Sequence, residues 1–554
     1  MIYSVEIIRK LVLVGFVLIV IFFSGKAQDR VLPMATPQLG SWGDQGDGTF
    51  RNPILNSNYP DSDVEQFGDR WYMISSKGTY MPGMTILESE DLVNWSIVGS
   101  IVDSISWEGT GDGVWAGDLV YHEGEWYCYF IDFGKGLFVS KSYNIKGPWS
   151  TPRLILEKSG MTDPTVYWDY EKREAYMICN YHIERRVSGD LYHIKLFKMN
   201  WEGTEIIDEG RLIYSEVGAE APKIYHINDY YYLFISEWTV NEQGKKLDRR
   251  QIVLRSKELE GPFERKVLLE EDSVTGRSSS QGSLIKVSEN EWWYTHQLVQ
   301  NQYSYEGRPQ FLIPVYWEND WPILGKDHDG NGINNTIWHH RKPVQGKPVK
   351  APQTDDDFNS INLGMQWLWD RNPLNDKWSL SEKLGSLRLY SCTPRNLNRT
   401  YHSLPNKLLQ RKMGLGIDTV TVQMGTENMV HGQKSGLIHI AHNFSTIGVE
   451  STNLGKLSFL ETPNGVVYGE KLTGDEIWLR SIANANNVRF EYSFDGEVYH
   501  QLGKYFTMIS RGFNGIFLGL YSMNNTGEGS ADFRWFSYEY DGPKKEKLTI
   551  ITKE

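Results

Sequence analysis

Three carboxylates occupy matching places in the first half of this 554-residue chain, and together they are suited to acid–base chemistry. Asp61, Asp163 and Glu220 each stand 11 to 13 residues before an aromatic, strand-like segment. A buried strand rarely begins with a carboxylate, because burying an unpaired charge is costly. Carboxylates that converge also raise one another's pKa, which a general acid requires. The pattern therefore favours a shared acid–base site. The alternative at any one position is an Asp that caps a turn, since Pro60 and Pro164 flank the two Asp residues.

The elements that would position these carboxylates form a repeat. A turn followed by an aromatic pair opens a strand-like run five times, at the markers Tyr72, Tyr127, Tyr176, Tyr232 and Trp293. The markers are 49 to 61 residues apart, and each turn with its alternating run predicts a β-hairpin. Repeats of this length, made of strand and turn alone, are typical of propeller blades. The sequence therefore predicts a five-bladed β-propeller. An irregular β-sandwich is the alternative, and the self-similarity argues against it.

Two further residues share the repeat position of the carboxylates. Trp115 and Gln281 stand about twelve residues before their markers, where a propeller places its innermost strand. All five side chains are therefore expected to meet at one mouth of the channel. Aromatic residues make up 13% of the chain, and flat rings stack on the C–H faces of sugars. Because β-rich proteins also use aromatic residues for cross-strand packing, this composition alone is compatible with either role.

Charge and cysteine content narrow the function classes. The formal net charge is −13 and the basic residues are scattered, which argues against a nucleic-acid partner. A neutral substrate fits this balance better than a polyanion, although a local basic pocket would override the global sign. The three cysteines, Cys128, Cys179 and Cys392, neither suggest a disulfide scaffold nor show zinc-site spacing.

Residues 1–27 have the pattern of a signal peptide. Arg9 and Lys10 precede an unbroken apolar run at 11–23, which is short for a membrane span. A small residue ends the segment, so cleavage is predicted after Ala27. We therefore expect a secreted or periplasmic protein with no membrane partner after cleavage. An uncleaved N-terminal anchor is the alternative.

Five motifs in chain order make the repeat recognisable. They are Tyr59-Pro60-Asp61, Trp115-Ala116-Gly117-Asp118-Leu119, Thr162-Asp163-Pro164, Glu220-Ala221-Pro222 and Gly307-Arg308-Pro309. Together they resemble glycoside hydrolase family 43, whose members share a five-bladed propeller with a funnel-like pocket. The resemblance implies that Asp61 is the general base, Glu220 the general acid, and Asp163 the residue that orients the acid and modulates its pKa. Asp63, two residues along the same strand face, is the competing choice of base.

The same resemblance suggests how a sugar would be held. Trp115 would stack on the terminal sugar, and Arg308 would hydrogen-bond to its hydroxyl groups. Gln281 stands where many family members place a His beside the channel axis, sometimes near a calcium ion. Trp238 would line the leaving-group side, or else pack at the rim.

We expect no cofactor or metal to be required. Residues 327–332 mimic the start of an EF-hand loop, but Trp338 stands where the bidentate Glu is needed. A structural calcium ion, in this loop or on the axis, is the alternative. Because Gln281 stands where many family members have a His, the sequence argues against a calcium ion on the channel axis.

Beyond the repeat the chain changes in character. Residues 341–354 are rich in Pro and Lys and predict a linker between a propeller domain at 28–340 and a second domain at 355–541. Segments such as 384–389 resemble the concanavalin-like β-sandwich that follows the propeller in β-xylosidase-like family members. Residues 542–554 form a Lys- and Glu-rich tail. The predicted fold class is therefore all-β, a five-bladed propeller followed by a β-sandwich.

The resemblance implies an exo-acting, inverting glycosidase. Such an enzyme would remove a terminal α-L-arabinofuranosyl or β-D-xylosyl residue from plant-type oligosaccharides or polysaccharides. Asp61 would activate a water molecule while Glu220 protonates the departing oxygen. Two alternatives stay open: a glycosidase of this fold acting on another terminal sugar such as β-D-galactose, and a non-catalytic glycan-binding propeller. The presence of all three carboxylates argues against the second.

Overall fold

The computed structural model of the protein describes residues 42–107, 113–184, 191–241, 246–272, 276–299, 305–510 and 514–543. The predicted signal peptide and nearly all of the predicted tail lie outside these residues. Within the described part, strands dominate, and the all-β fold class is confirmed. No helix of that part is long and apolar enough to cross a membrane.

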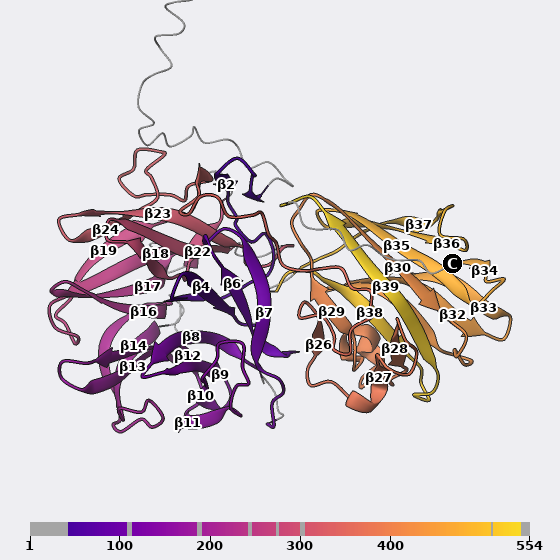
Figure 1. The fold of residues 1–554 in the computed structure, drawn as a ribbon, viewed down its shortest axis with the longest axis horizontal. Helices are drawn as coiled ribbons and strands as arrows, with labels where there is room; N and C mark the ends of the chain where they lie inside the picture. The colour runs from indigo at the N-terminus through magenta and orange to yellow at the C-terminus, as the bar shows by residue number, and fades with distance from the viewer. Residues whose placement is uncertain are drawn as a thin grey trace, which may run out of the picture. The chain divides into compact units, whose positions relative to one another are not determined.

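Five antiparallel sheets follow one another along the first half of the described chain, from indigo to rose in Figure 1. The first contains β3 (Asp63–Phe67), β4 (Arg70–Ser75), β6 (Gly83–Ser89) and β7 (Trp95–Val102). The second contains β8 (Trp115–His122), β9 (Glu125–Asp132), β10 (Gly136–Ser142) and β11 (Arg153–Glu157). The third contains β12 (Met161–Asp169), β13 (Glu174–Glu184), β14 (Leu191–Met199) and β15 (Arg211–Val217). The fourth contains β16 (Glu220–Ile227), β17 (Tyr230–Val240), β18 (Lys246–Ser256) and β19 (Glu264–Leu269). The fifth contains β20 (Ser278–Ser280), β21 (Leu284–Ser288), β22 (Glu291–Val299), β23 (Gln310–Glu318) and β24 (Trp321–Leu324).

The aromatic markers hold these sheets together as propeller blades. Side chains alternate along a strand, so its two faces contact different neighbours. On β9, Trp126 and Cys128 pack against the first sheet, whereas Tyr127 and Tyr129 pack against the third. The same alternation recurs on β13 and β17. A last cluster joins Trp71 of the first sheet to residues of the fifth, which closes the ring.

A sixth, smaller sheet departs from the prediction of five blades. It contains β1 (Gly43–Asp44), β2 (Thr49–Arg51) and β25 (His339–Arg341), so the described propeller region has six sheets rather than five. Phe50 pairs with His340, far along the chain. The repeat pattern missed this sheet because its strands come from opposite ends of the region and contain no aromatic hairpin marker.

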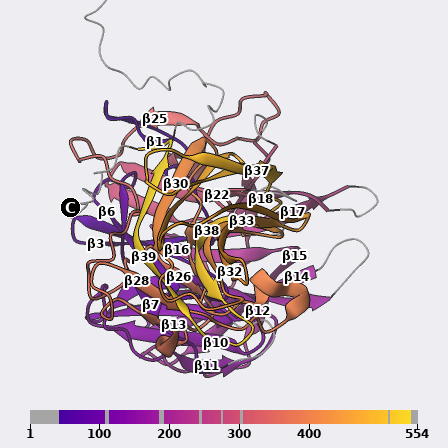
Figure 2. The same ribbon diagram turned by 90° about the vertical axis from the view of Figure 1, so that its right-hand side faces the viewer.

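The second half of the described chain is a two-layer β-sandwich. One sheet has the order β34-β33-β32-β31-β38-β29-β26-β5 and the other β27-β28-β39-β30-β35-β36-β37. In Figure 2, β30 and β39 run beside each other, as their pairing requires. The strands of this half are β26 (Leu368–Asp370), β27 (Trp378–Ser379), β28 (Leu387–Tyr390), β29 (Leu408–Arg411), β30 (Ile417–Gly425), β31 (Lys434–Ile440), β32 (Phe444–Thr452), β33 (Gly455–Thr462), β34 (Gly465–Lys471), β35 (Glu476–Asn484), β36 (Asn487–Ser493), β37 (His500–Thr507), β38 (Phe517–Met523) and β39 (Ser530–Tyr540). Short helical turns are η1 (Asn375–Lys377), η2 (Leu397–Arg399) and α2 (Thr400–Ser403).

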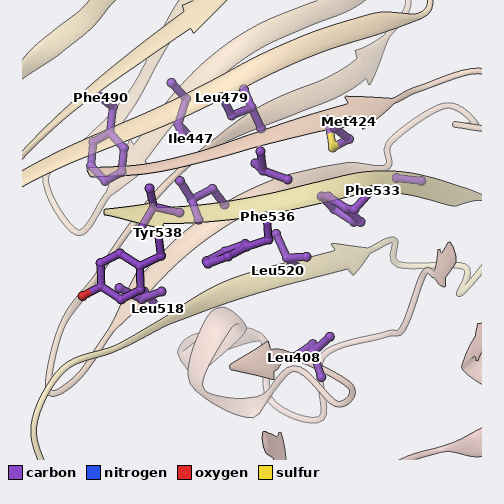
Figure 3. Packing of buried hydrophobic residues seen from close by; sticks show 14 of the residues in the cluster. Leu408, Met424, Ile447, Leu479, Phe490, Leu518, Leu520, Phe533, Phe536 and Tyr538 are labelled. Carbon is purple, nitrogen blue, oxygen red and sulfur yellow. The ribbon is translucent and has the colours of Figure 1, made fainter. Parts of the chain in front are cut away.

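The core of the sandwich lies between its two sheets. Figure 3 shows Leu518 and Leu520 of β38 close to Phe536 and Tyr538 of β39, which belong to opposite sheets. Burying each such side chain contributes roughly 1.5–3 kcal/mol. The sandwich is therefore a stable platform for the loops that it contacts.

One loop of the first blade is bound into the sandwich. The strand β5 (Tyr80–Met81) lies between β4 and β6 in the chain, yet it pairs with β26 at the edge of the eight-stranded sheet. Arg411 of β29 donates to the backbone oxygen of Asn58, and Ser57 Oγ donates to the backbone oxygen of Lys412 at 2.8 Å. These contacts fix the chain just before Asp61.

Candidate active site

The three predicted carboxylates lie near the starts of inner strands, and the hydrogen-bond ladder is interrupted at Asp163 and at Glu220. Asp61 and Asp163 have left-handed backbone φ values of 54° and 51°. The pairing of β12 with β13 shifts register between Thr162 and Thr165, and that of β16 with β17 shifts between Glu220 and Lys223. A proline lies inside each interruption and has no N–H to donate to the ladder. Such bulges redirect side chains and are common next to active sites.

Asp61 is held by several donors. Ser76 Oγ donates to Asp61 Oδ2 at 2.7 Å, and Arg308 Nη1 forms an ion pair with Oδ1. Its backbone N–H donates to Gln297 Oε1 at 3.0 Å. The Asp61 side chain is only 8% exposed, so these contacts fix the direction of the carboxylate.

A chain of amides links Asp61 to Asp163. Gln297 Nε2 lies 3.4 Å from Asp61 Oδ1 and 3.3 Å from Gln281 Oε1. Gln281 Nε2 in turn lies 3.4 Å from Asp163 Oδ1. The structure therefore brings Asp61, Asp163, Gln281 and Arg308 into one network.

The surroundings of Asp163 change the pKa of its carboxyl group. Burial, followed by the negative charges of Glu220 and Asp61, raises the pKa of Asp163 to about 7. Like charges raise a carboxyl pKa only when they are close. The three carboxylates therefore converge, as the repeat spacing predicted.

Glu220 contacts a residue that the sequence reasoning missed. Arg249 of β18 forms an ion pair with Glu220 Oε1 and donates to Ser280 Oγ at 3.2 Å. The Arg249 guanidinium also lies 4.8 Å from the centre of the Trp238 ring. The repeat pattern predicts inner residues on the first strand of each blade, whereas Arg249 comes from the third strand of its blade. Arg249 pairs with Trp238 across the ladder, so the predicted position of Trp238 was the feature that could have pointed to Arg249.

Trp238 and Trp115 are placed by glycines with left-handed φ. The Trp238 ring packs against Gly218, two residues before Glu220, and so supports Arg249. The Trp115 ring covers Gly78, where an added Cβ would lie 3.0 Å from Trp115 Cη2. The loop around Gly78 therefore forms one wall beside Trp115. Trp115 Nε1 is buried and has no hydrogen-bond partner in the described part of the chain.

Asp63, the competing choice of base, is fully engaged elsewhere. Its Oδ2 accepts from the backbone N–H of Leu119 at 2.7 Å. Its Oδ1 accepts from Ser283 Oγ at 2.9 Å and pairs with Lys223 Nζ at 3.0 Å. These partners place Asp63 in a separate buried cluster with Lys223 and Asp118, whereas Asp61 belongs to the network that contains Asp163, so the geometry favours Asp61 as the base.

A closed β-propeller in which three carboxylates converge beside Arg308 defines a class, that of carbohydrate-cleaving hydrolases. Residues 50–322 match the model of glycosyl hydrolases family 43. Residues 355–539 match the beta xylosidase C-terminal concanavalin A-like domain. The chain belongs to glycosyl hydrolase family 43 and is a glycosidase.

Similar proteins cover nearly the whole chain. A beta-xylosidase of Formosa agariphila is 43% identical over 92% of this chain and 94% of its own length. A non-reducing end alpha-L-arabinofuranosidase of Bacteroides ovatus is 26% identical over 88% of this chain and 94% of its own. The solved structure of the Bacteroides ovatus xyloglucan-locus GH43B protein superposes with a TM-score of 0.75 at 25% identity, covering 89% of this chain and all of that one. A Bacillus licheniformis GH43 structure, at 24% identity and a TM-score of 0.76, shares the fold.

Proposed function

We propose that this glycosidase removes terminal β-D-xylosyl residues from xylo-oligosaccharides. The observation that carries the proposal is the convergence of Asp61, Asp163 and Glu220 beside Arg308. The choice of xylose rests on the 43% identical relative, which is a beta-xylosidase. A terminal α-L-arabinofuranosyl residue is the second candidate, favoured by the 26% identical arabinofuranosidase.

The proposed mechanism gives each carboxylate one task. Asp61, fixed by Ser76 and Arg308, takes a proton from the attacking water. Glu220 donates a proton to the departing oxygen. Asp163, with its pKa near 7, exchanges between charged and neutral forms in the working pH range and so adjusts the field at Glu220. Direct attack by water inverts the anomeric carbon and needs about 6.5–9.5 Å between base and acid.

A panel of aryl glycosides tests this proposal. We expect turnover of 4-nitrophenyl β-D-xyloside, slower turnover of the α-L-arabinofuranoside, and none of the β-D-galactoside. Asp61→Asn should abolish turnover, because the amide cannot take the proton. Proton NMR of the first product should show α-xylose, the inverted anomer. A dominant β-anomer, or full activity in Asp61→Asn, would refute the assigned roles.

We also propose that no metal is needed. The Lys223 ammonium lies between Asp63 and Asp118, at 3.0 and 2.6 Å, and supplies the positive charge that those carboxylates need. In the EF-hand-like loop, Asp327 accepts from the backbone N–H groups of Gly330 and Gly332, which closes the turn. Activity should therefore survive EDTA, and restoration of lost activity by calcium would contradict this view.

Export with cleavage after Ala27 is proposed as well, supported by the charged and apolar pattern of residues 1–27. N-terminal sequencing of the mature protein should begin at Gln28. An intact N-terminus in the membrane fraction would instead indicate an anchor.

A further inference from the structure

A polar cavity lies where β5 joins the sandwich sheet. Its volume is about 310 Å³, which is within the range of small-ligand pockets. Its lining includes Tyr80 of β5, Asp370 of β26, and Phe517 of β38. None of the residues assigned to catalysis lines it.

The described lining of this cavity is mainly basic. Arg399, His402, Lys407 and His442 contribute to it, and Asp370 is its acidic residue. Asp370 Oδ2 is already occupied, because Lys407 Nζ donates to it at 2.7 Å. The chain as a whole carries a formal charge of −13, so the cavity locally reverses the sign of the protein.

Two of the basic groups are available to a ligand. Lys407 is almost fully buried and also donates to the backbone oxygen of Leu404 at 2.6 Å, so it belongs to the wall. The Arg399 guanidinium and the His442 imidazole are exposed at the cavity and form no hydrogen bond or ion pair with the described residues. A guanidinium matches the two oxygens of a carboxylate or a sulfate ester.

Part of the cavity wall is aromatic. The rings of Tyr80 and Phe517 lie 4.4 Å apart between centroids. An aromatic surface beside unpaired donors suits a sugar ring, which has apolar C–H faces and polar edges.

Both sides of the cavity continue into loops of the catalytic site. Tyr80 follows Gly78, which packs against Trp115. On the other side, Gly515 approaches Gly307 so closely that an added Cβ would lie 2.6 Å from the Gly307 nitrogen. Gly307 precedes Arg308, the partner of Asp61. The cavity is therefore connected by two short loop segments to Trp115 and to Arg308.

We propose that this cavity is a subsite for an anionic substituent, a carboxylate or a sulfate ester, on the oligosaccharide whose terminal pentose is removed. The inference rests on the proposed function for its link to catalysis. It assigns Arg399 and His442 as the residues that bind the anion and Tyr80 as the platform for the sugar that carries it.

Steady-state kinetics with matched substrates tests the link to catalysis. The substrates are xylotriose, xylotriose carrying a glucuronyl substituent, xylotriose carrying a sulfate ester, and 4-nitrophenyl β-D-xyloside. In the Arg399→Ala/His442→Ala double variant, KM for an acidic trisaccharide should rise about tenfold, the effect of losing one charge-assisted contact. The KM values for the two neutral substrates, xylotriose and 4-nitrophenyl β-D-xyloside, should change less than twofold. A response to one acidic substrate alone identifies the anion. Equal changes on neutral and acidic substrates, or no change on any, would overturn the proposal.

Arg395→Ala is the control variant. Arg395 is an exposed cation of the same segment that does not line the cavity, so its loss should leave all four KM values within twofold. A tenfold rise in this control would mean that the overall charge of the segment, rather than the cavity, attracts the anion.

Direct binding separates this inference from the proposed function. Saturation-transfer NMR should show stronger contact with methyl β-D-glucuronide than with methyl β-D-glucoside, and Arg399→Ala/His442→Ala should remove the difference. Equal signals from both glycosides would overturn the subsite even if the xyloside is hydrolysed. Preferential glucuronide binding would support it even if the xyloside is not.

Discussion

Lys223→Met tests whether a buried ion cluster holds the inner strands of the propeller in place. The ammonium donates to Asp118 Oδ1 at 2.6 Å and to the backbone oxygen of Gly117 at 3.2 Å, and it pairs with Asp63 at 3.0 Å. Asp118 Oδ2 accepts from the backbone N–H of Val166 at 2.9 Å, and Asp63 Oδ2 from that of Leu119. The cluster therefore joins β3, β8, β12 and β16. Asp61 lies just before β3, and Asp163 and Glu220 lie at the starts of β12 and β16.

The expected loss of stability is large because all three side chains are buried, at 8% exposure or less. Removing one partner from a buried ion pair costs about 3–5 kcal/mol. At roughly 2 °C per kcal/mol for a domain of this size, the Tm should fall by about 6–10 °C. The kcat should fall as well, because the same strands position the three carboxylates to which we assign catalysis.

The loss should depend on pH. Even with Lys223 present, burial raises the pKa of Asp118 to about 6. Without the ammonium this pKa rises further in the folded state, while in the unfolded state it stays near 3.9. A carboxyl group with a raised folded pKa destabilises the fold as the pH rises through that pKa. The Tm deficit should therefore be smaller at pH 5.5 than at pH 8.

Scanning calorimetry at the two pH values measures this deficit, with Lys198→Met as the control. Lys198 pairs with Glu174 at 2.6 Å, but both side chains are about a third exposed, and such pairs contribute about 0–1 kcal/mol. If Lys223→Met costs no more than the control at pH 8, or if its deficit does not shrink at pH 5.5, the cluster does not hold the strands as described.

Three further predictions concern the catalytic groups. Glu220→Ala should lower kcat on xylobiose by about 10²–10⁴-fold but far less on aryl xylosides, whose leaving groups need little protonation, and an equal loss on both would remove Glu220 as the acid. Asp163→Asn should eliminate the limb of the kcat/KM pH profile near pH 7. Ionisation of Asp163 costs stability as the pH rises through about 7, so the Tm of the variant should rise relative to that of the wild type between pH 6 and 8. An unchanged limb or a constant Tm difference would show that Asp163 does not titrate there. Arg249→Met removes the ion-pair partner that orients Glu220, so kcat should fall more on xylobiose than on aryl xylosides, and an equal loss on both substrates would show that the ion pair does not position the acid.

Local patterns explain what could be predicted of the fold. Turn residues and two-residue alternation are properties of neighbouring positions, so the hairpins at Tyr72, Tyr127 and the other markers could be recognised without a structure. The offset between marker and inner strand is also local, and it brought Asp61, Asp163, Glu220 and Gln281 together correctly. The small sheet of β1, β2 and β25 escaped prediction because its pairing depends on ring closure, which no local pattern records.

By itself the sequence determined the strand repeat and the family resemblance, and it predicted the three carboxylates as the site, because each follows from residue type and spacing along the chain. Only the tertiary structure determined which basic side chain forms an ion pair with each carboxylate. Asp61 pairs with Arg308, Glu220 with Arg249, and Asp63 with Lys223. The partners lie on different strands of different blades, and electrostatic interaction depends on distance through space rather than on separation in sequence. The same reason applies to the basic cavity, whose lining residues Tyr80 and Asp370 are brought together by the pairing of β5 with β26.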